Sequence, residues 1–424
     1  MVPRLEPIPM KLLIFEPCSA GHRLQYVRVI IDAFQDAAVE IVVVAEKTVS
    51  SSAEYGAHLK AVEDRFCLDP SVSRVTGTGL KLWGPVYRMF HNAVKRHQPD
   101  HVFIPFGDGI TQVMGVVRLL GINPIKAGVR FDTVLFRGKT PGEGKTIRDR
   151  IGSLIWQIAT ASAGADAYHL LNPFQYEAIL QRGFKPLARR CVMLPEPVEK
   201  IEKLSISQAR QRLSIPENGK FIACLGRLDR RKGADLMIKA FAKASLGDND
   251  RLLMFGAMDP DIKSMLENEY KVLVRRGQLI VIDRYLSQKE LEAALCAADV
   301  ICTPYPNHMT SSGFVVRAAA LGKPVLAADV GWMGKIVPVF GLGDTCDVTD
   351  ASIFSEAIQD ALNKAEFFTL TQYAKQFVAY HSIENCYAHW RATLPAKLQT
   401  RRPQGLLSWD NVRPHHVDSV LSEV

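Results

Sequence analysis

The sequence has no long apolar run, and this argues against a helical membrane protein. No eighteen consecutive apolar residues occur anywhere in the 424-residue chain, and a helix that spans a bilayer needs about that many. The early apolar run at residues 10–15 is short and leads into a glycine-containing loop. It is therefore predicted to be a first β-strand rather than a signal peptide.

Metal-binding and nucleic-acid-binding motifs are also lacking. The eight cysteines show no paired spacing of the kind that zinc sites use. Several of them lie in apolar runs, which predicts reduced core thiols in a cytoplasmic protein. The formal net charge of +8 favours anionic ligands and also suits the surface of an anionic membrane. With no recognisable nucleic-acid motif, we expect no nucleic-acid partner.

What the sequence does contain is an ordinary globular composition, with 47% hydrophobic and 23% charged residues. A chain of this length exceeds what one hydrophobic core supports, so two domains are expected. Apolar runs alternate with helical patterns in both halves, which predicts an α/β fold of two facing, Rossmann-like domains with doubly wound parallel sheets. The predicted strands are residues 11–15, 40–45, 101–105, 127–131, 167–171 and 191–194, then 221–225, 251–255, 279–282, 300–303, 324–327 and a weaker 337–340.

The pattern breaks at Pro195-Glu196-Pro197, which is predicted to be the hinge between the domains. We expect an N-terminal, acceptor-side domain at residues 1–198 and a C-terminal, donor-binding domain at 199–375. A C-terminal helix at 376–400 is expected to pack back on the first domain, and the polar tail at 401–424 to be loosely ordered.

The most informative motif begins at Gly226, directly after the apolar run at residues 221–225. Gly226 lets the chain turn, Arg227 and Lys232 supply two cations, and Gly233 precedes a predicted helix at 234–244. Ligands of open α/β sheets bind beyond the carboxyl ends of the strands, so these cations can meet a diphosphate there. Taken alone, the same residues also fit a solvated basic turn.

Together with the hinge and the segment at 304–325, this Gly-Arg-x-x-x-x-Lys-Gly loop resembles retaining glycosyltransferases of the GT-B fold, especially family 4. The match is strongest over residues 221–337 and is loose in the N-terminal half. The resemblance implies a nucleotide-sugar donor whose diphosphate is held by Arg227 and Lys232. It implies no cofactor and no divalent metal, and no clean Asp-x-Asp pair at a strand end asks for one.

The chain departs from the family at the two positions described next and at Lys335, where a member often has glutamate. Members usually carry two glutamates, eight positions apart, that bind the donor sugar and the ribose. Aligned on Gly322-Lys323-Pro324-Val325, those positions are Met309 and Arg317. Neither side chain can accept hydrogen bonds as a carboxylate does. Arg317 can instead bind a further anionic group on the donor.

Further donor-binding candidates lie in the loops of the C-terminal half. Ser311, Ser312 and Gly313 can offer hydroxyls and backbone N–H groups where a helix starts, although a plain helix N-cap explains them too. The remaining candidates are Phe314, Arg284 and Tyr285.

In the N-terminal half, Gly21 and His22 follow the first strand, where they can face donor phosphates or the acceptor; an ordinary strand-to-helix turn is the alternative. Asp108, between two glycines, can orient a hydroxyl or act as a base, although turn chemistry is slightly favoured. The loop at 137–145 is predicted to be a mobile acceptor-side or lid loop.

An amphipathic basic stretch at residues 81–97 can touch anionic lipid, but a core-facing helix with a solvated back is favoured. The sequence thus predicts a cytoplasmic glycosyltransferase, with peripheral contact to the inner face of an anionic membrane as an option. The acceptor is left open as a glycan, a lipid or a small molecule. Two alternatives stay open: a GT-B binding or assembly protein that has lost catalysis, and a GT-B enzyme of other chemistry such as an epimerase.

Overall fold

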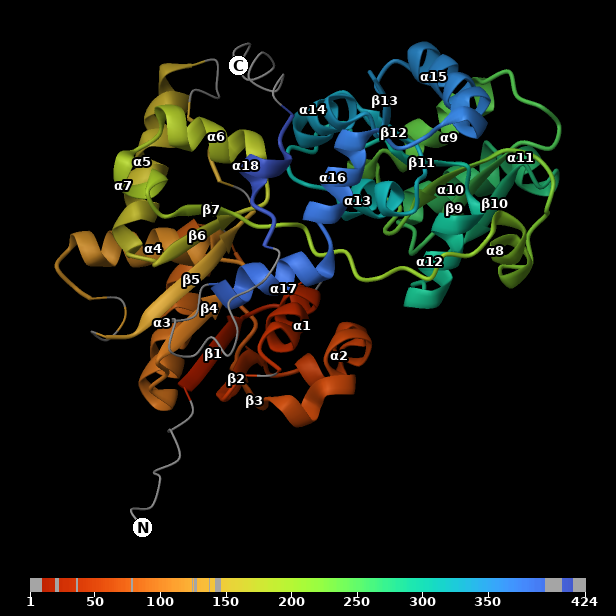
Figure 1. Cartoon of the computed structure of the whole chain (residues 1–424). Coiled ribbons are helices and arrows are strands. Elements are labelled where there is room, and N and C mark those ends of the chain that lie inside the picture. The colour runs from red at the N-terminus through yellow and green to blue at the C-terminus, as the bar shows by residue number, and fades with distance from the viewer. Residues whose placement is uncertain are drawn as a thin grey trace. The chain divides into compact units, whose positions relative to one another are not determined.

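The computed structural model describes residues 10–19, 23–35, 37–77, 79–123, 125, 128–136, 138–141, 146–392 and 406–414. The chain forms two compact units (Figure 1). The N-terminal unit takes Met1–Pro197 with Ile383–Ser408, and the C-terminal unit takes Val198–Ser382 with Trp409–Glu423.

The N-terminal unit is built on a sheet of seven parallel strands in the order β3-β2-β1-β4-β5-β6-β7. The order reverses between β1 and β4, which is where doubly wound sheets bind ligands. The strands are β1 Met10–Glu16, β2 Val39–Glu46, β3 Cys67–Val72, β4 His101–Ile104, β5 Arg130–Leu135, β6 Ala167–Leu170 and β7 Cys191–Met193. The helices are α1 Arg23–Ala33, α2 Ala53–His58, α3 Gly79–His97, α4 Asp108–Leu119, α5 Ile147–Ala163, α6 Pro173–Arg182, α7 Lys185–Ala188 and α17 Ile383–Ala392.

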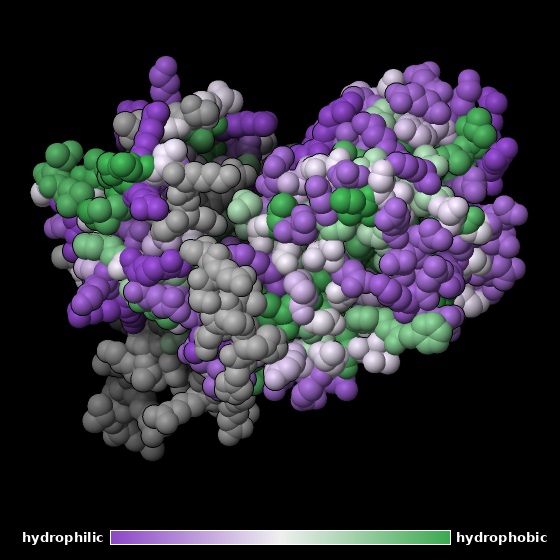
Figure 2. All heavy atoms as spheres, turned by 90° about the horizontal axis from the view of Figure 1, so that it is seen from above, coloured by the Kyte–Doolittle hydropathy of each residue, from purple (hydrophilic) through white to green (hydrophobic). Residues whose placement is uncertain are grey.

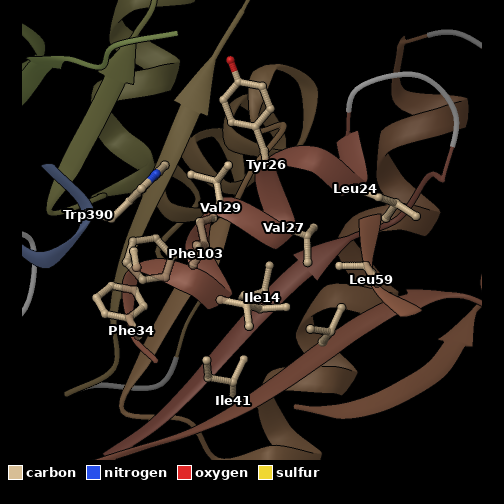
Figure 3. Close-up of a cluster of buried hydrophobic side chains, with 14 of the residues drawn as sticks. Ile14, Leu24, Tyr26, Val27, Val29, Phe34, Ile41, Leu59, Phe103 and Trp390 are labelled. Carbon is tan, nitrogen blue, oxygen red and sulfur yellow. The ribbon is translucent and has the colours of Figure 1, made fainter. Parts of the chain in front are cut away.

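Alternation along β1 explains how this sheet is covered on both faces. Successive strand residues point to opposite faces, so Ile14 joins the core under α1 and α17, whereas Phe15 meets Phe90 of α3 with 5.2 Å between ring centroids. Figure 3 shows the first of these cores, in which Trp390 of α17 lies beside Phe103. Helix α17 thus completes the N-terminal unit, although it comes late in the chain.

The C-terminal unit repeats the plan with six parallel strands in the order β10-β9-β8-β11-β12-β13. The strands are β8 Phe221–Leu225, β9 Arg251–Phe255, β10 Leu279–Ile282, β11 Val300–Thr303, β12 Val325–Ala328 and β13 Gly343–Cys346. The helices are α8 Ile206–Arg212, α9 Ala234–Lys243, α10 Pro260–Asn268, α11 Lys271–Arg275, α12 Gln288–Ala297, α13 Gly313–Ala320, α14 Gly331–Phe340, α15 Ala351–Lys364, α16 Gln372–Tyr380 and α18 Trp409–Val412.

The predicted fold class is confirmed, and several details are corrected. The strand predicted at 127–131 is β5 at Arg130–Leu135, and the run predicted as a strand at 337–340 ends helix α14 instead. Strands β3 and β13 were not predicted. In the tail, the described residues 406–414 include α18, whose buried Trp409 packs 5.8 Å from Phe340, so this part is ordered rather than loose. Among the described residues, no helix combines the length and apolarity needed to cross a bilayer.

Candidate functional site

The turn after β8 has the geometry that its glycines allow. Gly226 adopts φ 90°, and Gly233 adopts φ 67° at the start of α9. A Cβ on Gly233 would lie 1.9 Å from the backbone oxygen of Pro304, so only glycine fits where this turn meets the loop after β11. Between the two glycines, the Asp229 carboxylate accepts a hydrogen bond from the backbone N–H of Lys232 at 2.8 Å. The turn is therefore fixed by local contacts.

Lys232 is a cation without a counter-charge in this turn. Its ammonium nitrogen lies 5.4 Å from the ring centroids of both Tyr305 and Phe314. None of the described carboxylates forms an ion pair with it. Burial lowers the pKa of the Lys232 ammonium, and the neighbouring Arg231 and Arg227 lower it further. A half-buried, unpaired ammonium between two aromatic rings is well suited to receive an anion.

Arg227 lies near the start of the same turn, two residues after β8 ends. Its side chain is 66% exposed, and its guanidinium pairs with Asp259 at 2.8 Å and with Asp229 at 3.6 Å. These carboxylates occupy only part of the five-donor guanidinium fork. The side chain is largely exposed beside Lys232, and diphosphate binding by Arg227 and Lys232 stays a prediction.

The loop after β11 forms the wall opposite this turn. Tyr305 is only 3% exposed, and burial raises the pKa of its hydroxyl despite a hydrogen bond with Ser312. The ring of His308 is within 3.1 Å of the carbonyl oxygen of Ser311. Ser312 precedes α13 without capping it through its side chain, so the N–H groups at the start of α13 are not capped by that residue.

Met309 and Arg317 differ sharply in their surroundings. Met309 is 52% exposed in the loop. Arg317 is half-buried on α13, and no hydrogen bond or ion pair joins its guanidinium to any described residue. Like Lys232, Arg317 is therefore a half-buried cation without a described partner.

Comparison with known families identifies this unit. Residues 205–377 match the family model "Glycosyl transferases group 1". The C-terminal unit belongs to the group 1 glycosyltransferases.

Curated relatives agree with this assignment. A D-inositol 3-phosphate glycosyltransferase of Corynebacterium aurimucosum is 30% identical over 201 residues, which are 43% of this chain and 46% of the relative. A phosphatidyl-myo-inositol mannosyltransferase of Mycobacterium leprae is 28% identical over 204 residues, 43% of this chain and 51% of that protein. The chain spans about half the length of the curated relatives it matches.

Solved structures are similar to this chain over both of its units. Sucrose-phosphate synthase from Thermosynechococcus elongatus superposes with a TM-score of 0.64 at 16% identity, covering 90% of this chain and 97% of that one. Anabaena HepE, solved in complex with UDP, gives 0.62 at 14% identity and covers 91% and 99%. At such identities the likeness shows the fold alone, and that fold is GT-B.

Arg284 and Tyr285 lie in the loop after β10 of the group 1 unit. Arg284 forms a two-pronged ion pair with Glu290, at 3.0 and 2.5 Å. Glu290 also caps α12 together with Ser287, and these bonds lower the pKa of its carboxyl to about 2. Tyr285 is 66% exposed. The structure thus gives Arg284 a structural partner, and donor binding by these two residues stays a prediction.

In the N-terminal unit, Asp108 begins helix α4, and its carboxylate accepts a hydrogen bond from the backbone N–H of Phe136 at 3.2 Å. This contact ties the ends of β4 and β5 together, whether or not Asp108 also meets a hydroxyl. Gly21 and His22 lie outside the described residues, as does most of the predicted lid loop.

The sequence interpretation missed a buried pair beside Asp108. Glu16, at the end of β1, is fully buried and accepts a hydrogen bond from Arg23 at 2.8 Å, while its other oxygen has no partner. Burial raises the pKa of the Glu16 carboxyl to about 7, and Arg23 counteracts part of that rise. The guanidinium of Arg23 lies 4.2 Å from the ring centroid of Phe106. A glutamate that ends an apolar strand was the available signal.

The basic stretch at 81–97 is helix α3, and its apolar face belongs to the core. Val86, Phe90 and Val94 are buried, while Lys81, Arg88, Lys95 and Arg96 face solvent. The core-facing interpretation is confirmed. Leu82, Trp83 and Met89 of the same stripe are partly exposed, so contact of this helix with lipid stays a prediction.

Proposed function

We propose that this protein transfers a sugar from a nucleotide diphosphate donor to an acceptor, with retention of configuration and without a divalent metal. The observation that carries the proposal is the unpaired, half-buried ammonium of Lys232. It lies at the carboxyl end of the central strand of a group 1 glycosyltransferase unit. A cation held there without a counter-charge is expected to bind the donor diphosphate.

The chemistry follows from where charge develops. As the bond between the sugar and the diphosphate breaks, negative charge accumulates on the leaving diphosphate. Fixed cations such as Lys232 and Arg227 stabilise that charge more in the transition state than in the ground state, which lowers the barrier. The same electrostatic work is what a divalent metal would supply, so the two cations support metal-independent transfer.

The rest of the donor is held differently from the usual family pattern. Without carboxylates at Met309 and Arg317, the sugar and ribose hydroxyls need other partners, and Ser311, Ser312 and the N–H of Gly313 are suitable. Arg317, which has no described partner, fits a further anionic group on the donor. We therefore expect a donor that carries negative charge beyond its diphosphate, such as a carboxylate on the sugar.

The names of the relatives suggest which donor bases and acceptors to assay first. A structural relative was solved with UDP-glucose, so uridine conjugates come first. Curated relatives are named for D-inositol 3-phosphate and phosphatidyl-myo-inositol, which makes phosphorylated polyols the first acceptors to test. A cytoplasmic location would give the enzyme access to nucleotide sugars.

A second candidate is a GT-B protein that binds nucleotides but has lost catalysis. The missing carboxylates at Met309 and Arg317 favour it, since they remove two hydroxyl acceptors from the donor site. This candidate predicts ligand binding without release of nucleoside diphosphate from any nucleotide sugar.

A thermal-shift screen tests the proposal, because a ligand that binds only the folded protein raises its melting temperature. UDP, GDP, ADP and their sugar conjugates, including glucuronic acid conjugates, are compared on wild type, Lys232→Ala and the matched control Lys263→Ala. Lys263 is an exposed lysine already paired with Asp283. We expect a base-selective shift that Lys232→Ala loses and Lys263→Ala keeps. No shift with any nucleotide would contradict the donor site.

A further inference from the structure

Helix α5 presents an apolar face to solvent. Ile147, Ile151, Leu154 and Ile155 recur at the spacing of one helix face, and their exposed fractions are 77%, 53%, 50% and 61%. The opposite face, which includes Trp156, packs into the protein. A helix on a water-facing surface normally turns polar residues outward, so the outer face of α5 has the reverse pattern.

The end of α4 enlarges this surface. Helices α4 and α5 lie side by side: a Cβ on Gly115 would lie 1.7 Å from the backbone oxygen of Ala159, and Arg118 donates a hydrogen bond to the Ala163 carbonyl at 3.4 Å. Large aliphatic side chains at the end of α4 are again exposed. We call the whole set the aliphatic patch, made of Val116, Leu119, Leu120, Ile122, Ile147, Ile151, Leu154 and Ile155.

Figure 2 shows hydrophobic side chains gathered on the surface of the N-terminal unit, at the left of the view. Isolated exposed aliphatic residues are common, but a clustered patch marks a place where something else binds. The patch contains no aromatic residue and no methionine, which are the residues that protein interfaces favour. Its composition therefore fits hydrocarbon chains better than a protein partner.

Cations surround the aliphatic patch. Among the described residues between 116 and 155, the exposed charged side chains are Asp149 and four cations. Asp149 is held in the capping box of α5 with Thr146. The ammonium of Lys139 lies beside α5, because a Cβ on Gly152 would be 3.0 Å from it. The four cations are Arg118, Lys139, Arg148 and Arg150.

We propose that the aliphatic patch docks the protein onto an anionic lipid bilayer. The isoleucine and leucine side chains would enter the boundary between headgroups and acyl chains, while the surrounding arginines and Lys139 meet anionic headgroups. This surface is made of α4 and α5 and does not include helix α3, whose Val86, Phe90 and Val94 are buried in the core. The inference goes beyond sugar transfer and does not depend on the donor site.

Vesicle flotation with the full chain tests this proposal. Vesicles of phosphatidylcholine alone are compared with vesicles in which half of the lipid is phosphatidylglycerol. The test variant is Ile151→Ser with Ile155→Ser, at exposed positions where folding is not at risk. The matched control is Val272→Ser with Ile353→Ser, which are 49% and 47% exposed on the C-terminal unit. A charge variant replaces Arg148 and Arg150 with glutamine.

We expect wild type and the control to float with the anionic vesicles. The isoleucine variant should bind at least about tenfold more weakly, since each buried isoleucine contributes strongly to insertion. The arginine variant should bind several-fold more weakly, with a reduced dependence on salt.

Absence of wild-type binding, or equal binding by the isoleucine variant, would overturn the proposal. Sedimentation without lipid provides a second readout. If the chain self-associates through the patch, and the isoleucine substitutions abolish that association while vesicles bind neither form, the patch is a contact between copies and the proposal is wrong. Circular dichroism and melting temperature establish that each variant is folded.

Discussion

The two units share the strand order around the reversal of the sheet, but they differ in whether the charged side chain that follows or ends the corresponding strand has a partner. Strands β1 and β8 correspond to each other. In each sheet they lie next to the strand where the order reverses, β4 beside β1 and β11 beside β8. After β8, the cation Lys232 has no described partner. At the end of β1, the carboxylate of Glu16 is buried against Arg23 at 2.8 Å.

The difference lies in whether a described side chain balances the charge. In the C-terminal unit, none of the described carboxylates pairs with Lys232, and we propose that a donor diphosphate supplies the counter-charge. In the N-terminal unit, Arg23 already pairs with Glu16, and burial raises the pKa of the Glu16 carboxyl to about 7 despite that partner. We therefore expect the anionic donor to bind in the C-terminal unit, whereas Glu16 and Arg23 already pair with each other in the N-terminal unit.

The largest expected effect comes from removing the unpaired cation of the C-terminal unit. Lys232→Ala should lower turnover about a hundredfold, roughly 3 kcal/mol of transition-state stabilisation, because a charge contact to the leaving diphosphate is lost. Initial rates of nucleoside diphosphate release measure this. Lys263→Ala, which removes an exposed lysine paired with Asp283, should keep wild-type turnover. Equal rates for Lys232→Ala and wild type would place the diphosphate elsewhere.

The turn that positions Lys232 can be tested separately through stability. Gly233 and Gly277 adopt similar φ angles of 67° and 68°, but only Gly233 has an atom within reach of an added Cβ, the Pro304 oxygen at 1.9 Å. Gly277→Ala should therefore cost only the backbone strain, about 1 kcal/mol. Gly233→Ala should cost about 3 kcal/mol more, because backbone atoms must move. Urea unfolding of both variants measures the difference, and similar losses would show that the contact relaxes easily.

Charge burial in the N-terminal unit predicts a dependence on pH. His169 is fully buried against Trp390, and burial lowers the pKa of its imidazole from 6.5 to about 4. The imidazole of His169 therefore binds a proton more tightly in the unfolded chain than in the folded one. The contribution of neutral His169 to the free energy of unfolding is fully present above pH 6.5 and is lost as the pH falls toward about 4. Between about pH 7 and about pH 5 the loss is roughly 2 kcal/mol.

His169→Phe should remove this acid sensitivity, whereas His91→Phe, at an exposed histidine, should keep it. Urea unfolding at both pH values measures the two slopes. An unchanged slope in His169→Phe would mean that His169 does not set the acid response.

The smallest expected effect concerns Arg227. Its guanidinium already pairs with Asp259 and Asp229. Its positive charge is therefore partly balanced, and we expect it to contribute less binding free energy to an anionic ligand than Lys232 does. Arg227→Ala should weaken donor binding about tenfold, or ~1.4 kcal/mol, as measured by calorimetric titration. A larger loss than that of Lys232→Ala would reverse the ranking of the two cations.

Much of the fold could be predicted because buried parallel strands read as apolar runs. The strands predicted at 221–225, 251–255, 279–282 and 300–303 agree with β8 to β11. The failures have physical causes. Strand β5 contains the polar Asp132 and Thr133, β3 contains Pro70 at a sheet edge, and the apolar run at 337–340 lies in a helix whose buried face has a similar composition.

The candidate site was predictable only where it is contiguous in sequence. Gly226 to Gly233 forms one motif, so its turn could be inferred from residue types alone. The pair of Glu16 and Arg23 depends on burial by neighbouring strands, and the aliphatic patch depends on which face of α5 packs inward. Neither property is encoded in local spacing.

The most direct test of the central claim is the release of nucleoside diphosphate from nucleotide sugars by the purified wild-type chain, with and without phosphorylated polyol acceptors. The account predicts release that is selective for one base, is stimulated by an acceptor and continues when divalent metals are chelated. Saturable nucleotide binding with no release from any donor would contradict it, and would assign the protein to the GT-B binding proteins that have lost catalysis.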